Sequence, residues 1–234
     1  MPDNEKAQGN SWYQLVKLGQ EHLEQIMELQ SLIRGQLNNK ELCLYVSRDE
    51  FREMLGEKGI VLGAIVGGKV VAIFSALFPG EKNPENLGTV LGLPDDELIR
   101  VGHLEIAFNH PDYRGKDLYY QMGEQIISIL RTGSSVRHLC STIDPKNIPP
   151  LKKSLLLDMQ IVKINEMYDG LARFILYQDL NRPARWEDNK VVRIDLKDLN
   201  RQQQLLQSGW RGVSFIQETD AAFIEYRKLS TNGG

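Results

Sequence analysis

The residues best suited to chemistry lie in one stretch, 103–118, which reads HLEIAFNHPDYRGKDL. It contains a carboxylate, Glu105, two histidines, His103 and His110, and a turn around Gly115. A carboxylate can act as a general base, and an imidazole titrates near neutral pH. The apolar residues at its start predict a strand, and the run YYQMGEQIISILR after it predicts an amphipathic helix. Because the first N–H groups of a helix have no intrahelical partner and favour an anion, this turn predicts a phosphate site.

The residues before this stretch predict a strand, two helices and a hairpin. The pair Ser47 and Glu50 is typical of a capping box, and the pair Gly67-Gly68 between two apolar runs is typical of a tight hairpin. A dinucleotide-binding loop is excluded there, because a strand and not a helix follows. The expected ranges are strand 11–18, helix 21–37, helix 48–55, and strands 60–66 and 69–78.

The connection 79–102 is unusually long and holds one predicted helical turn at 95–98. It could be a lid or an acceptor-binding loop, and a solvated insertion fits equally well.

The residues after the stretch predict further helices and strands. A helix near 117–133 is followed by a short strand and by a helix that Asn147 caps, with Pro149 and Pro150 in its first turn. Asp169-Gly170 predicts another hairpin. The remaining expected elements are strand 138–143, strand 189–196, helix 198–208, strand 211–216 and strand 221–229.

The composition is that of a globular protein, with 41% hydrophobic and 25% charged residues among 234. A net charge of -3 argues against a general nucleic-acid or anionic-membrane binder. No apolar run is long enough to span a bilayer, and the N-terminus lacks an apolar signal core, so we expect a cytoplasmic protein. Cys43 and Cys140 are too far apart in sequence to suggest a zinc site, and we expect no metal.

The stretch resembles the GNAT acetyltransferases, which use acetyl-CoA. The looser signature of that family, Pro-x-Tyr-Arg-Gly-x-x-Leu, is matched in full by Pro111, Tyr113, Arg114, Gly115 and Leu118. The stricter motif, Arg/Gln-x-x-Gly-x-Gly/Ala, is matched at its first position and departs at the other two, where Asp117 and Tyr119 stand.

A second match follows about thirty residues later. It resembles the family segment Pro-x-Asn-x-x-Ser/Ala, a helix, then Gly-Phe, and it is carried by Pro145, Asn147 and Pro150. Asp158-Met159 stands at the Gly-Phe position.

The resemblance implies an α/β (α+β) GNAT fold, a mixed and mostly antiparallel sheet flanked by helices. It covers roughly residues 12–180. We therefore expect a flexible N-terminus over 1–10, an acetyltransferase domain over 11–182, and a small β-α-β-β extension over 183–234, for which the resemblance implies no function.

Acetyl-CoA would bind along the stretch if the resemblance holds. Backbone N–H groups of the turn would contact the pyrophosphate, Asn147 the pantetheine arm, and the N–H of Asn109 or Phe108 the thioester oxygen. Asp117 could instead cap the helix or repel the phosphate, a charge that Arg114 and Lys116 would partly offset. The residues expected to contact acetyl-CoA are Phe108, Asn109, His110, Arg114, Gly115, Lys116, Asp117, Leu118 and Asn147.

The resemblance makes Glu105 the candidate base. Strand alternation places it on the face opposite Leu104 and Ile106, although a solvated or salt-bridged glutamate fits equally. His103 and His110 are more simply explained as structural or surface residues.

The tyrosine that the family uses as an acid is replaced by Ser154. Tyr119, Tyr120 or Tyr168 could substitute, or the thiolate could leave without a protein acid. Of these we select Tyr120 as the candidate acid.

The expected function is acetyl transfer from acetyl-CoA to a primary amine of a small molecule or peptide, in a ternary complex. We expect no nucleic-acid or membrane partner, and a homodimer is possible. The alternatives are a catalytically weak acyl-CoA sensor, supported by Asp117 and Ser154, and a protein-interaction module in which the C-terminal extension is functional.

Overall fold

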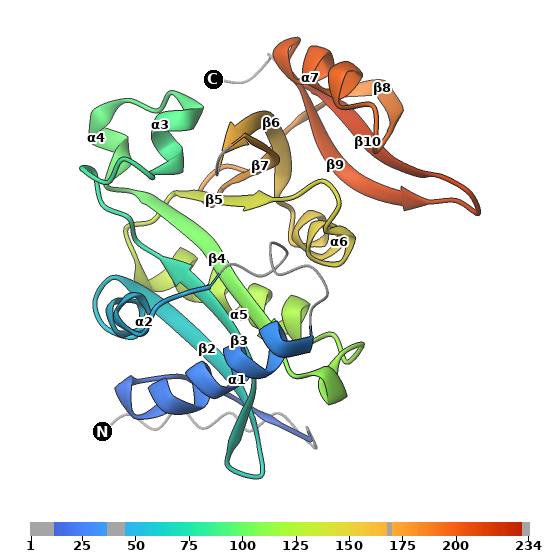
Figure 1. The fold of residues 1–234 in the computed structure, drawn as a ribbon. Helices are drawn as coiled ribbons and strands as arrows, with labels where there is room; N and C mark the ends of the chain where they lie inside the picture. Colours follow the sequence, from blue (N-terminus) through green and yellow to red (C-terminus); the bar gives the residue numbers. More distant parts are fainter. Residues whose placement is uncertain (1–11, 37–44, 168–169, 231–234) are drawn as a thin grey trace.

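The computed structural model describes residues 12–36, 45–167 and 170–230, and its strands form one ten-stranded sheet with helices on both faces (Figure 1). The strand order is β1-β2-β3-β4-β5-β7-β6-β9-β10-β8. Every neighbouring pair is antiparallel except β4 and β5, which are parallel. The expected mixed, mostly antiparallel sheet is confirmed.

The strands are β1 Gln14–Lys17, β2 Gly59–Val66, β3 Lys69–Leu77, β4 Val101–Asn109, β5 His138–Ile143, β6 Gln160–Met167, β7 Leu171–Asp179, β8 Trp186–Asp195, β9 Trp210–Gln217 and β10 Ala222–Leu229. The α-helices are α1 Leu23–Gln36, α2 Arg48–Met54, α3 Leu87–Leu91, α4 Asp95–Leu98, α5 Leu118–Gly133, α6 Ile148–Leu156 and α7 Leu199–Gln207. Short 3₁₀ turns precede α1, at Gln20–His22, and α5, at Pro111–Tyr113.

The local signals of the first half act as the sequence predicts. The Ser47 hydroxyl accepts a hydrogen bond from the Glu50 N–H at 3.2 Å, and the Glu50 carboxylate accepts one from the Ser47 N–H at 2.6 Å. Gly67 and Gly68 have φ of +55° and +77°, which closes the β2–β3 hairpin.

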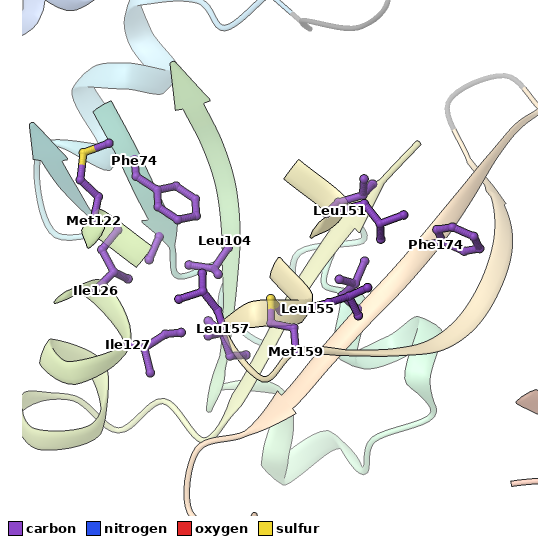
Figure 2. Close-up of a cluster of buried hydrophobic side chains, with 14 of the residues drawn as sticks. Phe74, Leu104, Met122, Ile126, Ile127, Leu151, Leu155, Leu157, Met159 and Phe174 are labelled. Atoms are coloured by element: carbon purple, nitrogen blue, oxygen red, sulfur yellow. The ribbon is translucent and has the colours of Figure 1, made fainter. Parts of the chain in front are cut away.

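Two apolar layers cover the faces of the sheet. On one face, α5 and α6 pack against the strands, where side chains from both helices and from β3, β4 and β7 point toward one another (Figure 2). On the other face, α1 and α2 bury Ile26, Phe51 and their neighbours against Ile73 and Phe108. The central strands are therefore held from both sides.

The connection before β4 is structured and partly packed: Asn86, Leu87, Gly88 and Leu98 are buried, while most residues of 81–85 and 92–96 are exposed. It contains the expected turn, α4, and also α3, which was not predicted. Leu87 of α3 is buried with Val101, Cys140 and Ile175 of the sheet. Because α3 is short and carries a glycine inside, its periodicity is too weak to predict a helix.

The contact between α4 and β5 is ionic. The Glu97 carboxylate lies 2.8 Å from His138 Nε2 and 3.3 Å from Arg137 Nη1. The hydrogen bond with His138, together with the charges of nearby arginines, lowers the pKa of Glu97. These contacts hold the segment on the same sheet face as α1 and α2.

The C-terminal extension has the expected strand, helix, strand, strand order and continues the main sheet. Its β9 joins β6 through the pair Ile161 and Gly212. Buried Ile224 and Tyr226 of β10 belong to the same apolar cluster as the residues of α5 and α6. The Tyr226 hydroxyl donates to Gln202 Oε1 at 2.8 Å.

We expect this shared core to unfold in one transition. Ile224→Ala removes a fully buried side chain and should lower the free energy of unfolding by about 2–5 kcal/mol. The control Val191→Ala, at a position 47% exposed, should change it by no more than about 0.5 kcal/mol.

The measurement is urea unfolding followed by tryptophan fluorescence and by far-UV circular dichroism. Trp186 and Trp210 lie in β8 and β9, so fluorescence reports strongly on the extension. If fluorescence changed at lower urea concentration than circular dichroism, the extension would be an independent folding unit.

Candidate active site

The two central parallel strands separate inside the sheet. β4 pairs with β5 only through Val101, Gly102 and His103, while all six residues of β5 pair with β7. The Ser141 hydroxyl donates to the Leu104 carbonyl at 2.8 Å, just beyond the last paired residue. From Glu105 onward, the edge of β4 that faces β5 has no strand partner among the described residues.

A bulge in β4 lies at the point of separation. Between the pairs Phe74 with Ala107 and Ala76 with Leu104, β4 advances by three residues while β3 advances by two. Glu105 and Ile106 therefore both face Ser75, whose hydroxyl accepts a hydrogen bond from the Ile106 N–H at 3.2 Å.

Because of the bulge, Ile106 does not lie on the face of Leu104, where strand alternation predicted it. Leu104 packs with the α5 cluster, whereas Ile106 packs with the α1 and α2 cluster. Glu105 lies on that second face too, because it alternates with Leu104. It is thus opposite Leu104, as expected, but on the same face as Ile106, since a bulge interrupts strict alternation. Its side chain is 37% exposed.

The end of β4 offers unpaired polar groups to the gap. The His110 N–H donates to the Val71 carbonyl of β3 at 2.8 Å. Since N–H directions alternate along a strand, the Phe108 N–H points toward β3 and the Asn109 N–H points away from it. The side-chain oxygen of Asn109 is buried and has no hydrogen-bond partner among the described residues.

The turn after β4 leads into α5 through two residues with positive φ, Gly115 at +76° and Asp117 at +61°. A Cβ atom at Gly115 would meet nothing within 4 Å, so the backbone there is open. The Gln121 N–H donates to the Asp117 carbonyl at 3.2 Å, as the first hydrogen bond of α5. The N–H groups of 118–120 precede that bond and carry the positive end of the helix dipole.

The charged side chains of the turn take three different positions. The Asp117 carboxylate makes no capping hydrogen bond and pairs with Lys153 Nζ of α6. Lys116 Nζ lies 4.5 Å and 4.9 Å from the ring centroids of Trp12 and Tyr113. Arg114 is exposed. The expected alternative, that Asp117 competes for the helix N–H groups by capping them, is therefore not the arrangement adopted.

Asn147 occupies the N-cap position of α6, but its side chain makes no capping hydrogen bond, which corrects that expectation. At the other end of α6, Asp158 has φ of +62°. This is the left-handed conformation that glycine adopts freely and that aspartate tolerates better than most residues. Asp158 thus adopts the backbone conformation that suits the glycine of the family's Gly-Phe position.

Two of the three candidate tyrosines have defined partners. The Tyr119 hydroxyl lies 3.0 Å from Ser154 Oγ, and the Tyr120 hydroxyl donates to Glu124 Oε1 at 2.7 Å. Tyr120 borders a cavity of about 230 Å³ between α5 and the end of α6. Since α5 covers the sheet face opposite Glu105, the candidate base Glu105 and the candidate acid Tyr120 are not brought together. Tyr168 lies outside the described residues.

The two histidines have structural contacts. His110 accepts a hydrogen bond at Nδ1 from the Asp112 N–H at 3.3 Å and packs edge-on against Tyr113. His103 is 3% exposed, with Nδ1 3.0 Å from Glu105 Oε1. The pair of His103 and Glu105 was not predicted from the sequence, although residues two apart on a strand share a face.

Arg173 of β7 and Cys140 of β5 are buried. Arg173 is 7% exposed and pairs with Asp144 at 3.8 Å. Cys140 is fully buried, and burial raises the pKa of its thiol. Cys43 lies outside the described residues. Within 12–36, 45–167 and 170–230, no group of three or more His, Cys, Asp or Glu could hold a metal ion, and no helix is long and apolar enough to cross a membrane.

A comparison with protein-family models and another with curated protein sequences give no match. Solved structures do resemble the fold. NAA60 from Arabidopsis thaliana, in complex with acetyl-CoA, has a TM-score of 0.58 and 10% identity, and covers 73% of this chain and 99% of its own. The loading GNATL domain of CurA from Lyngbya majuscula has a TM-score of 0.56 and 13% identity, with coverage of 73% and 99%.

The ribosomal-protein-S18-alanine N-acetyltransferase from Escherichia coli has a TM-score of 0.52 and 14% identity, with coverage of 76% and 97%. Each of these structures is therefore matched over nearly its whole length, while about a quarter of this chain lies outside each match. The chain has the GNAT acetyltransferase fold, as the sequence resemblance implies.

We expect Tyr119 to ionise late. Burial raises the pKa of its hydroxyl from 10.0 to about 12, while the hydrogen bond with Ser154 acts in the opposite direction. The folded protein thus keeps this proton to higher pH than the unfolded chain. The resulting stabilisation is complete below pH 10.0 and is lost as the pH rises through about 12.

The measurement is an absorbance titration of tyrosinate. Tyr119→Phe should remove one ionisation near pH 12 and leave the transition near pH 10.0 unchanged. Loss of an ionisation near pH 10.0 would show that the hydroxyl is exposed to water.

Proposed function

We propose that this protein transfers an acetyl group from acetyl-CoA to a primary amine of a small molecule or a peptide, by direct attack in a ternary complex. The observation that carries the proposal is the opening between β4 and β5, with Glu105 at its edge and the free N–H groups of α5 beyond its end. Neighbouring structures with the same fold, one of them in complex with acetyl-CoA, support it.

The groups around the opening fit an acyl-CoA. The turn from Arg114 to Leu118 has an open backbone at Gly115 and helix N–H groups that suit a pyrophosphate. The Asp117 carboxylate, which would repel phosphate, is paired with Lys153. The Asn147 amide makes no capping bond and would be available to the pantetheine arm.

The acyl end would lie against the last residues of β4. The Asn109 N–H, directed away from β3, would donate to the thioester oxygen, where negative charge develops. The unpartnered side-chain oxygen of Asn109 is an acceptor for an amide N–H of the ligand. Phe108 and His110 flank Asn109 in the chain. Their own N–H groups point toward β3, so they would not donate to the thioester oxygen.

Glu105 would receive a proton from the ammonium of the acceptor, directly or through one water. The neutral amine then forms a bond to the thioester carbon, and the carbon–sulfur bond breaks. The nitrogen loses its second proton to water as the amide forms, and the departing thiolate takes up a proton to give free CoA. Because this reaction needs orientation more than covalent help, the protein's main contribution would be the fixed geometry of β4 and α5.

A tyrosine could supply that last proton. We favour Tyr119, because its hydroxyl reaches Ser154, the position at which the sequence resemblance implies a tyrosine. Its hydroxyl carries a proton at neutral pH, as any tyrosine does, and the pKa raised by burial makes it a weaker acid than a free tyrosine. Tyr120, selected from the sequence, stays a candidate, although its hydroxyl proton is already donated to Glu124.

The two sequence features that favour a catalytically weak sensor both have compensating contacts. Lys153 pairs with Asp117, and Tyr119 supplies a hydroxyl beside Ser154. These contacts support the enzymatic proposal over the sensor.

The phosphate turn is tested by a matched pair of variants at Gly115. Asparagine and aspartate are nearly isosteric and both tolerate a positive φ, so Gly115→Asn and Gly115→Asp differ mainly in charge. We expect Gly115→Asp to bind acetyl-CoA at least about tenfold more weakly than Gly115→Asn, measured by calorimetric titration. Equal affinities of the two variants would place the phosphates elsewhere.

The base is tested by Glu105→Gln. Loss of the proton acceptor should lower kcat about 10²-fold or more with the acetyl-CoA affinity unchanged, measured as CoA thiol release with a panel of aminoglycosides, polyamines and peptides. Glu57→Gln, an exposed carboxylate before β2, is the control and should retain full turnover. Wild-type binding of acetyl-CoA without turnover of any amine would favour the sensor instead.

A further inference from the structure

A buried histidine connects the candidate base to the segment before β4. His103 Nε2 lies 3.1 Å from the Leu87 backbone nitrogen, and His103 Nδ1 lies 3.0 Å from Glu105 Oε1. The histidine is 3% exposed, so these contacts exclude water from both of its ring nitrogens.

The two contacts select one tautomer of the ring. The Leu87 N–H can only donate, so His103 Nε2 accepts through its lone pair and carries no proton. The proton of the neutral imidazole then lies on Nδ1, where it is directed at the Glu105 carboxylate. A backbone amide thus determines which ring nitrogen donates to the base.

The amide that does so is itself held in place. Leu87 is the first residue of α3, and the Asn86 side chain caps that helix by accepting from the Gly88 N–H at 2.8 Å. The Asn86 amide nitrogen lies 2.9 Å from the Gly80 carbonyl and 3.1 Å from the Leu98 carbonyl. Asn86 is fully buried, so this part of the segment is a rigid support.

The base needs such support because of its location. Glu105 lies in the bulge of β4, and its side chain is 37% exposed, so water alone would leave it several rotamers. A single donor from a buried ring restricts that choice to orientations in which Oε1 meets Nδ1.

We propose that His103 is a positioning residue: it orients the Glu105 carboxylate, and the Leu87 amide fixes the tautomer that makes this possible. The inference rests on the proposed function. It adds that the segment carrying α3 contributes to the reaction through His103.

Two conservative variants separate the two contacts. In His103→Asn the amide nitrogen stands as many bonds from Cα as Nδ1, so a donor to Glu105 is kept and the acceptor for Leu87 is lost. In His103→Gln the carbonyl oxygen stands as many bonds from Cα as Nε2, so the acceptor is kept and the donor is lost. Gln202→Ala is the structural control, because Gln202 is also buried but its contacts, with the Leu196 carbonyl and the Tyr226 hydroxyl, lie in the C-terminal extension.

We expect His103→Gln to lower kcat about tenfold or more with the acetyl-CoA dissociation constant unchanged. His103→Asn should retain kcat within about threefold, and Gln202→Ala should lower the melting temperature without changing kcat. The assay is CoA thiol release with the amine that the wild type acetylates fastest. A purely structural histidine would instead give equal losses in His103→Gln and His103→Asn.

Nitrogen-15 NMR of the imidazole rings tests the tautomer of His103 in the free protein, with no amine substrate present. The His103 signals should be those of an Nδ1–H ring in the wild type. An Nε2–H ring, or a loss of kcat in His103→Asn as large as in His103→Gln, would overturn the inference while leaving the proposed function intact. If the wild type acetylates no amine of the panel, the proposed function fails and the inference fails with it, because no base remains to be positioned.

Discussion

The separation of β4 from β5 is the constraint on which the rest of the site depends. Two parallel strands in the middle of a sheet would ordinarily pair along their whole length, and here they pair over three residues only. The extra residue at the bulge turns β4 away, and the Ser141 hydroxyl satisfies the carbonyl of Leu104 where the ladder stops. The Asn109 amide is left directed into the gap, and α5 begins just beyond it.

An opening in the centre of a sheet loses backbone hydrogen bonds, and packing on both faces offsets that loss. On one face, Leu104 of β4 and Leu157, which follows α6, belong to the cluster formed with α5 (Figure 2). On the other face, α1 and α2 bury Phe108, and α3 buries Val101. β4 is therefore held by pairing with β3 and by side chains on both faces, although from Glu105 onward it has no partner on the β5 side.

The departures from the resembling motifs are accommodated by contacts between α5 and α6. Asp117 finds a cation in Lys153, and Ser154 finds a hydroxyl in Tyr119. Asp158 adopts the left-handed backbone conformation in which a glycine would be expected. Helix N–H groups and turn geometry can bind an anion independently of side-chain identity, so these departures leave in place the backbone groups that the proposed function needs.

The sequence by itself determined the local structure. The capping box at Ser47, the glycine pair at 67–68 and the strand–turn–helix around Gly115 are specified by residues a few positions apart, so their elements could be predicted. Only the tertiary structure decided which residues meet. The bulge moves Ile106 to the face of Glu105, and His103 meets the amide of Leu87, 16 residues away. Tyr119 and Ser154 are 35 residues apart. Such contacts depend on strand register and on how α5 packs against α6, and no local pattern of residues encodes either.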